Sequence, residues 1–127
     1  MKIGIGIGTA VGFAQSLTRS ARLRDDIQEK LQAAAEKVAD KVRDAVPVDE
    51  GALRESVRVL PGRSAPSVEI VAGGASTTDE KGFDHALSVE FGTRRQRARP
   101  FFYPTIRQNL DLIEDAVPNA ITDPTES

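Results

Sequence analysis

The chain has 127 residues, 39% of them apolar, which suits one compact core and argues against two independent domains. Its 17 Lys and Arg residues against 19 Asp and Glu residues give a net charge of -2, so no global basic field draws the whole protein onto a phosphate backbone. The absence of cysteine excludes disulfides, thiolate nucleophiles and sulfur ligands for a metal ion.

The first 16 residues form a glycine-rich segment. Ile3, Ile5 and Ile7 alternate with glycines, which is the two-residue period of a strand with one bare face. We therefore expect residues 1–16 to form a flexible or strand-forming arm, in preference to a secretory signal, whose apolar segment the glycines would dilute. No later stretch approaches the ~18 to 20 apolar residues that a membrane span requires, so we expect a soluble intracellular protein without membrane contact.

One long amphipathic helix is predicted next. It should begin between Phe13 and Ser20 and end near Val46, because Pro47 disfavours helical geometry in the residue before it. A single apolar stripe suits a sheet beneath the helix. The stripe positions recur every three or four residues and are Leu23, Ile27, Leu31, Ala34, Ala35, Val38, Val42 and Ala45.

Two stretches rich in β-branched residues follow. Residues 55–60 and 67–72 each carry Val or Ile at alternate positions, and the intervening PGRSAP supplies turn residues. We therefore expect an antiparallel hairpin. Residues 73–82 contain three glycines and no apolar residue larger than Ala, which predicts an exposed mobile loop.

Two more helices are expected in the last third of the chain. Residues 83–91 follow helical spacing, and Gly92 lies where a left-handed C-terminal cap is expected. The second helix should begin at Pro104, carry an apolar stripe as far as Val117 and end at Pro118.

These elements define the expected fold class, which is α+β. A long N-terminal amphipathic helix packs on a small antiparallel sheet, with a short helix and a C-terminal helix. The arm at residues 1–16 precedes a single domain at residues 17–118, and a frayed tail at residues 119–127 follows it.

Motifs for catalysis or cofactor binding are weak. The early glycines lack the G-x-G-x-x-G spacing, and Gly-Lys-Ser/Thr is missing. The single histidine, His85, makes a poor zinc cluster, and its combination with Ser56 or Ser88 lacks a nucleophile-elbow motif. Adjacent acids such as Asp25 and Asp26 point apart. We expect no catalytic, cofactor-binding or metal-binding residue and no enzymatic activity.

A basic and aromatic segment at residues 91–104, FGTRRQRARPFFYP, is the strongest functional candidate. Its arginines could bind phosphates while an aromatic side chain stacks on a base, as in single-strand binding proteins. Arg, Phe and Tyr are also the residue types that protein interfaces favour. A protein contact is the preferred interpretation. The first alternative is a small nucleic-acid-binding protein that uses the loop from Arg94 to Tyr103, and a toxin-like or regulatory interaction module comes third.

Three blocks resemble a known family in the same order and at similar spacings. They are VPVDEGALRESV at residues 46–57, HALSVEFGT at residues 85–93 and RPFFYPTI at residues 99–106. Together they resemble the gene-product-ten-like family of neck and tail-completion proteins from long-tailed bacteriophages and prophages, over about residues 20–117. The matching positions are Pro47, Asp49, Gly51, Leu53, Arg54, Ser56, Ala86, Val89, Glu90, Phe91, Gly92, Thr93, Pro100, Phe101 and Pro104. The sequence departs from the family pattern at Glu50, His85 and Thr105, where Thr, Tyr and Ala are usual.

The resemblance implies a non-enzymatic structural protein of the virion neck or tail, assembled in the host cytoplasm. It would form a ring, with sixfold or twelvefold symmetry, that joins the head connector to the tail or completes the tail. Its partners would be other neck, connector and tail-tube proteins, with possible passage of DNA through the lumen.

A ring contact between identical chains needs two different surfaces. We expect one of them to consist of Arg94, Arg95, Arg97, Arg99, Phe102 and Tyr103. Acidic groups of a neighbouring copy, such as Asp79 and Glu80, would supply the other.

Several motif positions have an expected structural role. Asp49 and Gly51 should turn the chain into Leu53. Glu90 should hold the arginine loop by a charge-assisted hydrogen bond, and Phe91 and Phe101 should act as packing anchors. The positions Gly92, Thr93, Pro100 and Pro104 complete the pattern.

Overall fold

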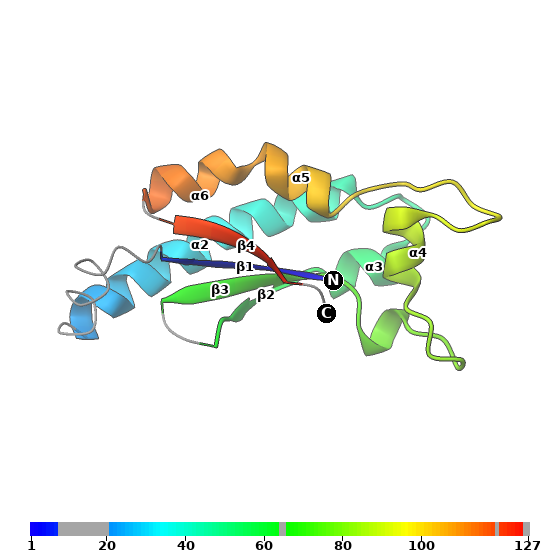
Figure 1. Cartoon of the computed structure of the whole chain (residues 1–127), viewed down its shortest axis with the longest axis horizontal. Helices are drawn as coiled ribbons and strands as arrows, with labels where there is room; N and C mark the ends of the chain where they lie inside the picture. The colour runs from blue at the N-terminus through cyan, green and yellow to red at the C-terminus, as the bar shows by residue number, and fades with distance from the viewer. Residues whose placement is uncertain (8–20, 64–65, 119, 126–127) are drawn as a thin grey trace.

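A four-stranded antiparallel sheet forms one layer of the protein, with the strand order β2-β3-β1-β4 (Figure 1). The computed structural model describes residues 1–7, 21–63, 66–118 and 120–125. The strands are β1 (Lys2–Ile7), β2 (Arg58–Pro61), β3 (Ser67–Val71) and β4 (Ala120–Thr125). Ile3 of β1 lies opposite Ile70 of β3, and Ile5 lies opposite Val68. All four of these side chains are buried, so the alternation of isoleucine with glycine gives β1 a single core face.

The long helix α2 (Ala21–Ala45) packs across the sheet (Figure 1). The helix ends at Ala45, two residues before Pro47, as predicted from the effect of proline on the preceding residue. Its expected start lies outside the described residues. The inner face of α2 is closely packed because small and branched side chains let the helix approach the strands. Its fully buried members are Leu31, Ala35, Val38, Ala39 and Val42. Together with the hairpin formed by β2 and β3, this confirms the predicted α+β fold class.

The C-terminal helical region differs from the expectation of one continuous helix. It consists of α5 (Tyr103–Gln108) and α6 (Leu110–Ala116), which both pack on α2. The break falls at Asn109, whose side-chain amide donates a hydrogen bond of 2.7 Å to the carbonyl oxygen of Thr105. Asparagine competes in this way with the helical backbone ladder, which explains the break.

The connections hold three short helical elements: α3 (Gly51–Ser56), a 3-10 turn η1 (Ala75–Thr77) and α4 (His85–Phe91). The expected helix at residues 83–91 is confirmed. The strand expected from residue 55 begins only at Arg58, because Leu53 and Ser56 bury one face of a helical turn instead. The segment expected as a mobile loop is tied to Asp84, which accepts hydrogen bonds from the Gly74 amide and from the Thr77 hydroxyl.

The two terminal segments belong to the sheet. β1 lies between β3 and β4, and β4 occupies residues 120–125, where the sequence predicted a frayed tail. The tail prediction was wrong because β1 has hydrogen-bonding backbone groups along both of its edges. β3 pairs with one edge, and β4 pairs with the other. No helix in the described part of the chain is long and apolar enough to cross a membrane.

Candidate functional site

The arginine loop is anchored at its C-terminal end by one buried carboxylate. Glu90, only 3% exposed, lies on the inner face of α4. Its Oε1 accepts hydrogen bonds of 2.8 and 2.9 Å from the amides of Phe101 and Phe102, and its Oε2 accepts one of 3.1 Å from the Tyr103 amide. Amides at the start of a helix have no carbonyl partner in that helix, so a carboxylate there satisfies them and complements the helix dipole. Glu90 thereby fixes the start of α5 against the end of α4.

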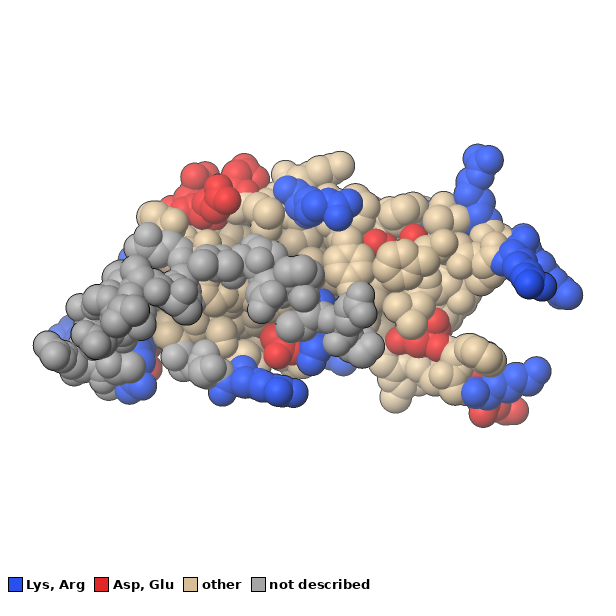
Figure 2. Space-filling model, viewed as in Figure 1, with Lys and Arg blue, Asp and Glu red and all other residues tan. Residues whose placement is uncertain are grey.

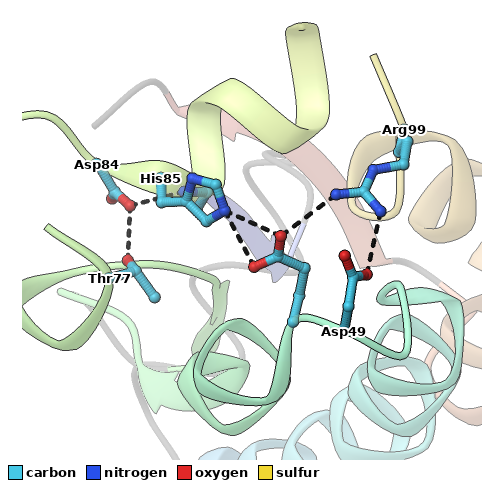
Figure 3. Close-up of polar contacts among 7 residues, drawn as sticks. Asp49, Thr77, Asp84, His85 and Arg99 are labelled. Carbon is cyan, nitrogen blue, oxygen red and sulfur yellow. Dashed lines mark hydrogen bonds and ion pairs between the residues drawn. The ribbon is translucent and has the colours of Figure 1, made fainter. Parts of the chain in front are cut away.

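A second set of contacts ties the loop to the turn between α2 and α3. Arg99 donates to Asp49 Oδ1 at 3.1 Å and to Glu50 Oε1 at 3.3 Å, and its backbone amide donates to the carbonyl oxygen of Val89 at 2.7 Å. Both Glu50 oxygens lie 3.0 Å from His85 Nε2. Figure 3 shows Asp49, His85 and Arg99 converging from three segments of the chain. Arg99 is therefore engaged within the subunit, and the structure does not group it with the other loop arginines.

The tip of the loop is a turn closed by its own polar groups. Gly92 has a φ of 77°, and a Cβ there would lie 2.7 Å from the Ala98 nitrogen. The Thr93 amide donates to the Gln96 carbonyl oxygen at 2.8 Å, and the Thr93 hydroxyl oxygen accepts from the amides of Arg95 and Gln96. Such a hydroxyl-capped turn fixes the backbone of the loop.

Three side chains of the loop are exposed, those of Arg94, Arg95 and Arg97. The loop projects from one end of the molecule (Figure 1), and Figure 2 shows a group of basic residues at that end. Within the described residues none of the three has an ion-pair partner. We call these three residues the loop arginines. Their charges are available to another molecule.

An apolar stripe lies beside the loop, on the outer face of α4 and just before that helix. Leu87 and Phe91 of α4 are 44% and 63% exposed, and Phe83, two residues before the helix begins, is 68% exposed. The opposite face buries Ala86 and Val89, so the segment is apolar on two sides. A helix that is apolar on both faces is normally covered on both. We call the stripe and the loop arginines together the α4–loop surface.

Two aromatic predictions need correction. Phe91 is exposed and is not a packing anchor within the subunit, whereas Phe101 is fully buried as expected. Phe102 was expected at an interface, but it is also fully buried, because it packs into the core beside Phe101 at the start of α5. Tyr103 is half-buried, with its ring centroid 4.9 Å from that of Phe102 and 6.1 Å from that of Phe91. Phe101 and Phe102 cannot stack on nucleic-acid bases.

The turn that leads into α3 involves the expected motif residues. The Glu50 amide donates to the Pro47 carbonyl oxygen at 2.9 Å, Gly51 begins the helix and Leu53 is buried. Asp49 contributes its carboxylate to Arg99.

Ser56 and His85, which were considered for hydrolysis or metal binding, make other contacts in the structure. The buried hydroxyl of Ser56 donates to the Leu53 carbonyl oxygen and accepts from the Gly73 amide, and His85 contacts Glu50. Within the described residues no group of three His, Asp or Glu side chains could hold a metal ion.

Sequence reasoning missed the exposed stripe. Residues 83–91 were assigned to a helix from their spacing, and Phe91 was expected to be a packing anchor. The available signal was that the stripe recurs every four residues, while Ala86 and Val89 define a second face.

A family comparison agrees with this arrangement. The family model described as "Bacteriophage HK97-gp10, putative tail-component" matches residues 12–99, which is more than half of the chain. The match includes α4 and the loop arginines and ends before Pro100, so most of the third block of the resemblance lies beyond it. The comparisons with curated proteins and with solved structures found no match. The chain belongs to the HK97-gp10-like family of bacteriophage tail components.

Proposed function

We propose that the chain is a non-enzymatic structural subunit of the phage neck. Its copies form an oligomeric ring, of sixfold or twelvefold symmetry, that joins the head connector to the tail or completes the tail. The observation that carries the proposal is the α4–loop surface, in which exposed apolar side chains lie beside unpaired arginines. The description of the family as a tail component supports a structural role in the virion.

The chemistry of this surface favours a protein partner. Interfaces are enriched in aromatic residues and arginine, which combine buried apolar area with directed hydrogen bonds. The base of the loop is already fixed by Glu90 and Arg99, so little conformational entropy is lost when a partner binds. Other neck, connector and tail-tube proteins assembling in the host cytoplasm are the expected partners beyond the ring itself.

Nucleic-acid binding is the weaker alternative. The loop arginines could contact phosphates, but Phe101 and Phe102 are buried and the net charge is -2. We therefore assign DNA a place only as the molecule that passes through the lumen of the ring.

Removal of the gene from the phage that encodes this chain tests the proposal. We expect heads and tails to accumulate separately in electron micrographs, and a plasmid copy of the gene should restore joined particles. Immunogold labelling should place the chain at the junction between head and tail. Normal joined particles that lack the chain would overturn the proposed function.

A further inference from the structure

The loop arginines and a group of carboxylates on α6 lie toward opposite ends of the subunit. Asp111, Glu114 and Asp115 are exposed on α6, and their spacing of three and four residues places them on one side of the helix. Within the described part of the chain none of these carboxylates forms an ion pair. We call them the acidic face. Figure 2 shows an acidic group over α6 and basic residues at the far tip of the arginine loop.

We propose that the α4–loop surface docks on α6 of a second copy of this chain, with the loop arginines against the acidic face. The inference rests on the proposed function, because it supplies the contact between neighbouring subunits of the ring. Three unpaired cations and three unpaired carboxylates would neutralise one another. The apolar stripe, which is largely exposed in the described subunit, would be shielded from water at the same contact.

The positions of the two surfaces exclude closure within one subunit. The arginine loop projects from one end of the longest axis, and α6 lies toward the other end (Figure 1). The Arg99 and Glu90 contacts hold the base of the loop in place, so the loop cannot fold back over that distance. The acidic face must therefore be reached by the loop of another copy.

A two-fold contact that pairs the α4–loop surface with itself is disfavoured by the same charges, because it would bring two sets of loop arginines together. Like charges at short range repel one another, whereas a head-to-tail contact pairs opposite charges. Each head-to-tail contact also leaves one loop and one acidic face free for the next copy, which is the requirement for a ring.

The earlier candidate for the acidic partner, Asp79 with Glu80, fits less well. This pair lies in the turn before α4, at the same end of the molecule as the arginine loop (Figure 1). The carboxylate of Asp79 already accepts hydrogen bonds from the backbone amides of Lys81 and Phe83. The acidic face of α6 is therefore the preferred partner.

Charge reversal on one side should abolish association. In a loop-reversed variant, Arg94, Arg95 and Arg97 are each replaced by Glu. Sedimentation velocity of the full chain should show self-association for the wild type, weakened by added salt because the contact is charged. The loop-reversed variant should bind itself about tenfold more weakly or worse, since each contact then opposes like charges.

Restoration by the complementary change makes the test specific. In an α6-reversed variant, Asp111, Glu114 and Asp115 are each replaced by Lys. This variant alone should also fail to associate, whereas a mixture of the two reversed variants should assemble, because every contact in the mixture again joins opposite charges. A chain that carries both sets of changes should associate as well. Unchanged thermal unfolding of each variant would show that the subunits remain folded.

Several results would overturn the inference. They are a wild type that stays monomeric at every concentration tested, reversed variants that associate normally, and a mixture that fails to assemble although both variants are folded. The same variants are also tested for retention on DNA. If the wild type is retained, the loop-reversed variant is not, and the mixture of reversed variants does not assemble, nucleic acid is the partner instead. Association that is unchanged by charge reversal would contradict this contact but not the proposed neck function, because the gene-removal experiment tests that function separately.

Discussion

At the scale of single residues, Glu90 determines the position of the loop. A buried carboxylate is costly unless it is compensated, and three backbone amides compensate this one. The sequence predicted that Glu90 holds the loop, but the atoms it contacts could not be read from spacing alone. Those contacts depend on the end of α4 and the start of α5 meeting in space.

Replacement of Glu90 by Gln should lower the free energy of unfolding. The amide retains one oxygen for Phe101 and Phe102, but those two bonds lose their charge assistance. Its NH2 group faces the Tyr103 amide, so the third bond is lost and two donors oppose each other. We expect a loss of about 1–3 kcal/mol in urea denaturation. Glu80→Gln, on an exposed residue, is the matched control and should change stability little. Equal stability of the two variants would contradict the assigned role of Glu90.

Two nearby phenylalanines should respond differently to substitution. Phe102 is fully buried, so Phe102→Ala should cost about 3–5 kcal/mol of unfolding free energy. Phe91 is 63% exposed, so Phe91→Ser should leave the melting temperature nearly unchanged while weakening self-association of the chain. Calorimetry and sedimentation together separate the two effects. A large loss of stability in Phe91→Ser would place that ring in the core instead.

One further residue-scale contact joins two departures from the family pattern. Glu50 and His85 stand where Thr and Tyr are usual, and their side chains lie 3.0 Å apart. The two departures thus form one interaction, which also involves Arg99 through its ion pair with Glu50. The family resemblance named the two positions separately, and only the fold shows that they meet.

At the scale of elements, those with a strong apolar periodicity were predicted correctly. The helix break and the last strand, which depend on local contacts, were not. The C-terminal end of α2, the central part of its apolar stripe and the alternation in β3 follow directly from the sequence, whereas Leu23 and Ala45, expected in the stripe, are exposed. The break at Asn109 was missed because the apolar stripe continues through it from Ile106 to Ile113. β4 was missed because strand pairing in a short polar segment depends on the partner strand.

The junction between α4 and the arginine loop depends on a glycine. Gly92→Ala should destabilise the fold, because φ is positive there and the new Cβ would meet the Ala98 nitrogen at 2.7 Å. We expect a loss of about 1–3 kcal/mol or more in thermal or urea denaturation. Gly82→Ala has a similar φ of 86° with nothing within 4 Å, so it measures the backbone cost without the clash. A smaller loss at Gly92 than at Gly82 would contradict the close packing of this turn.

At the scale of the whole molecule, the separation of charges is the feature that sequence could not supply. Composition gives a net charge of -2, and the chain order places the loop arginines only 14 to 21 residues before the acidic face. The fold moves these two groups toward opposite ends, because α5 and α6 run back along α2 (Figure 1). In the proposed contact, the basic loop of a mildly acidic protein would be one half of a directional pairing.

The most direct measurement compares phages with neutralised arginines at two locations. One phage carries Gln at Arg94, Arg95 and Arg97. The matched control carries Gln at three exposed arginines elsewhere, which are Arg22, Arg63 and Arg107. Both changes remove three positive charges, and the fraction of heads with attached tails is counted in electron micrographs. We predict that the loop variant yields separated heads and tails while the control resembles the wild type. Joined particles in equal numbers from both phages would contradict the claim that this surface builds the junction.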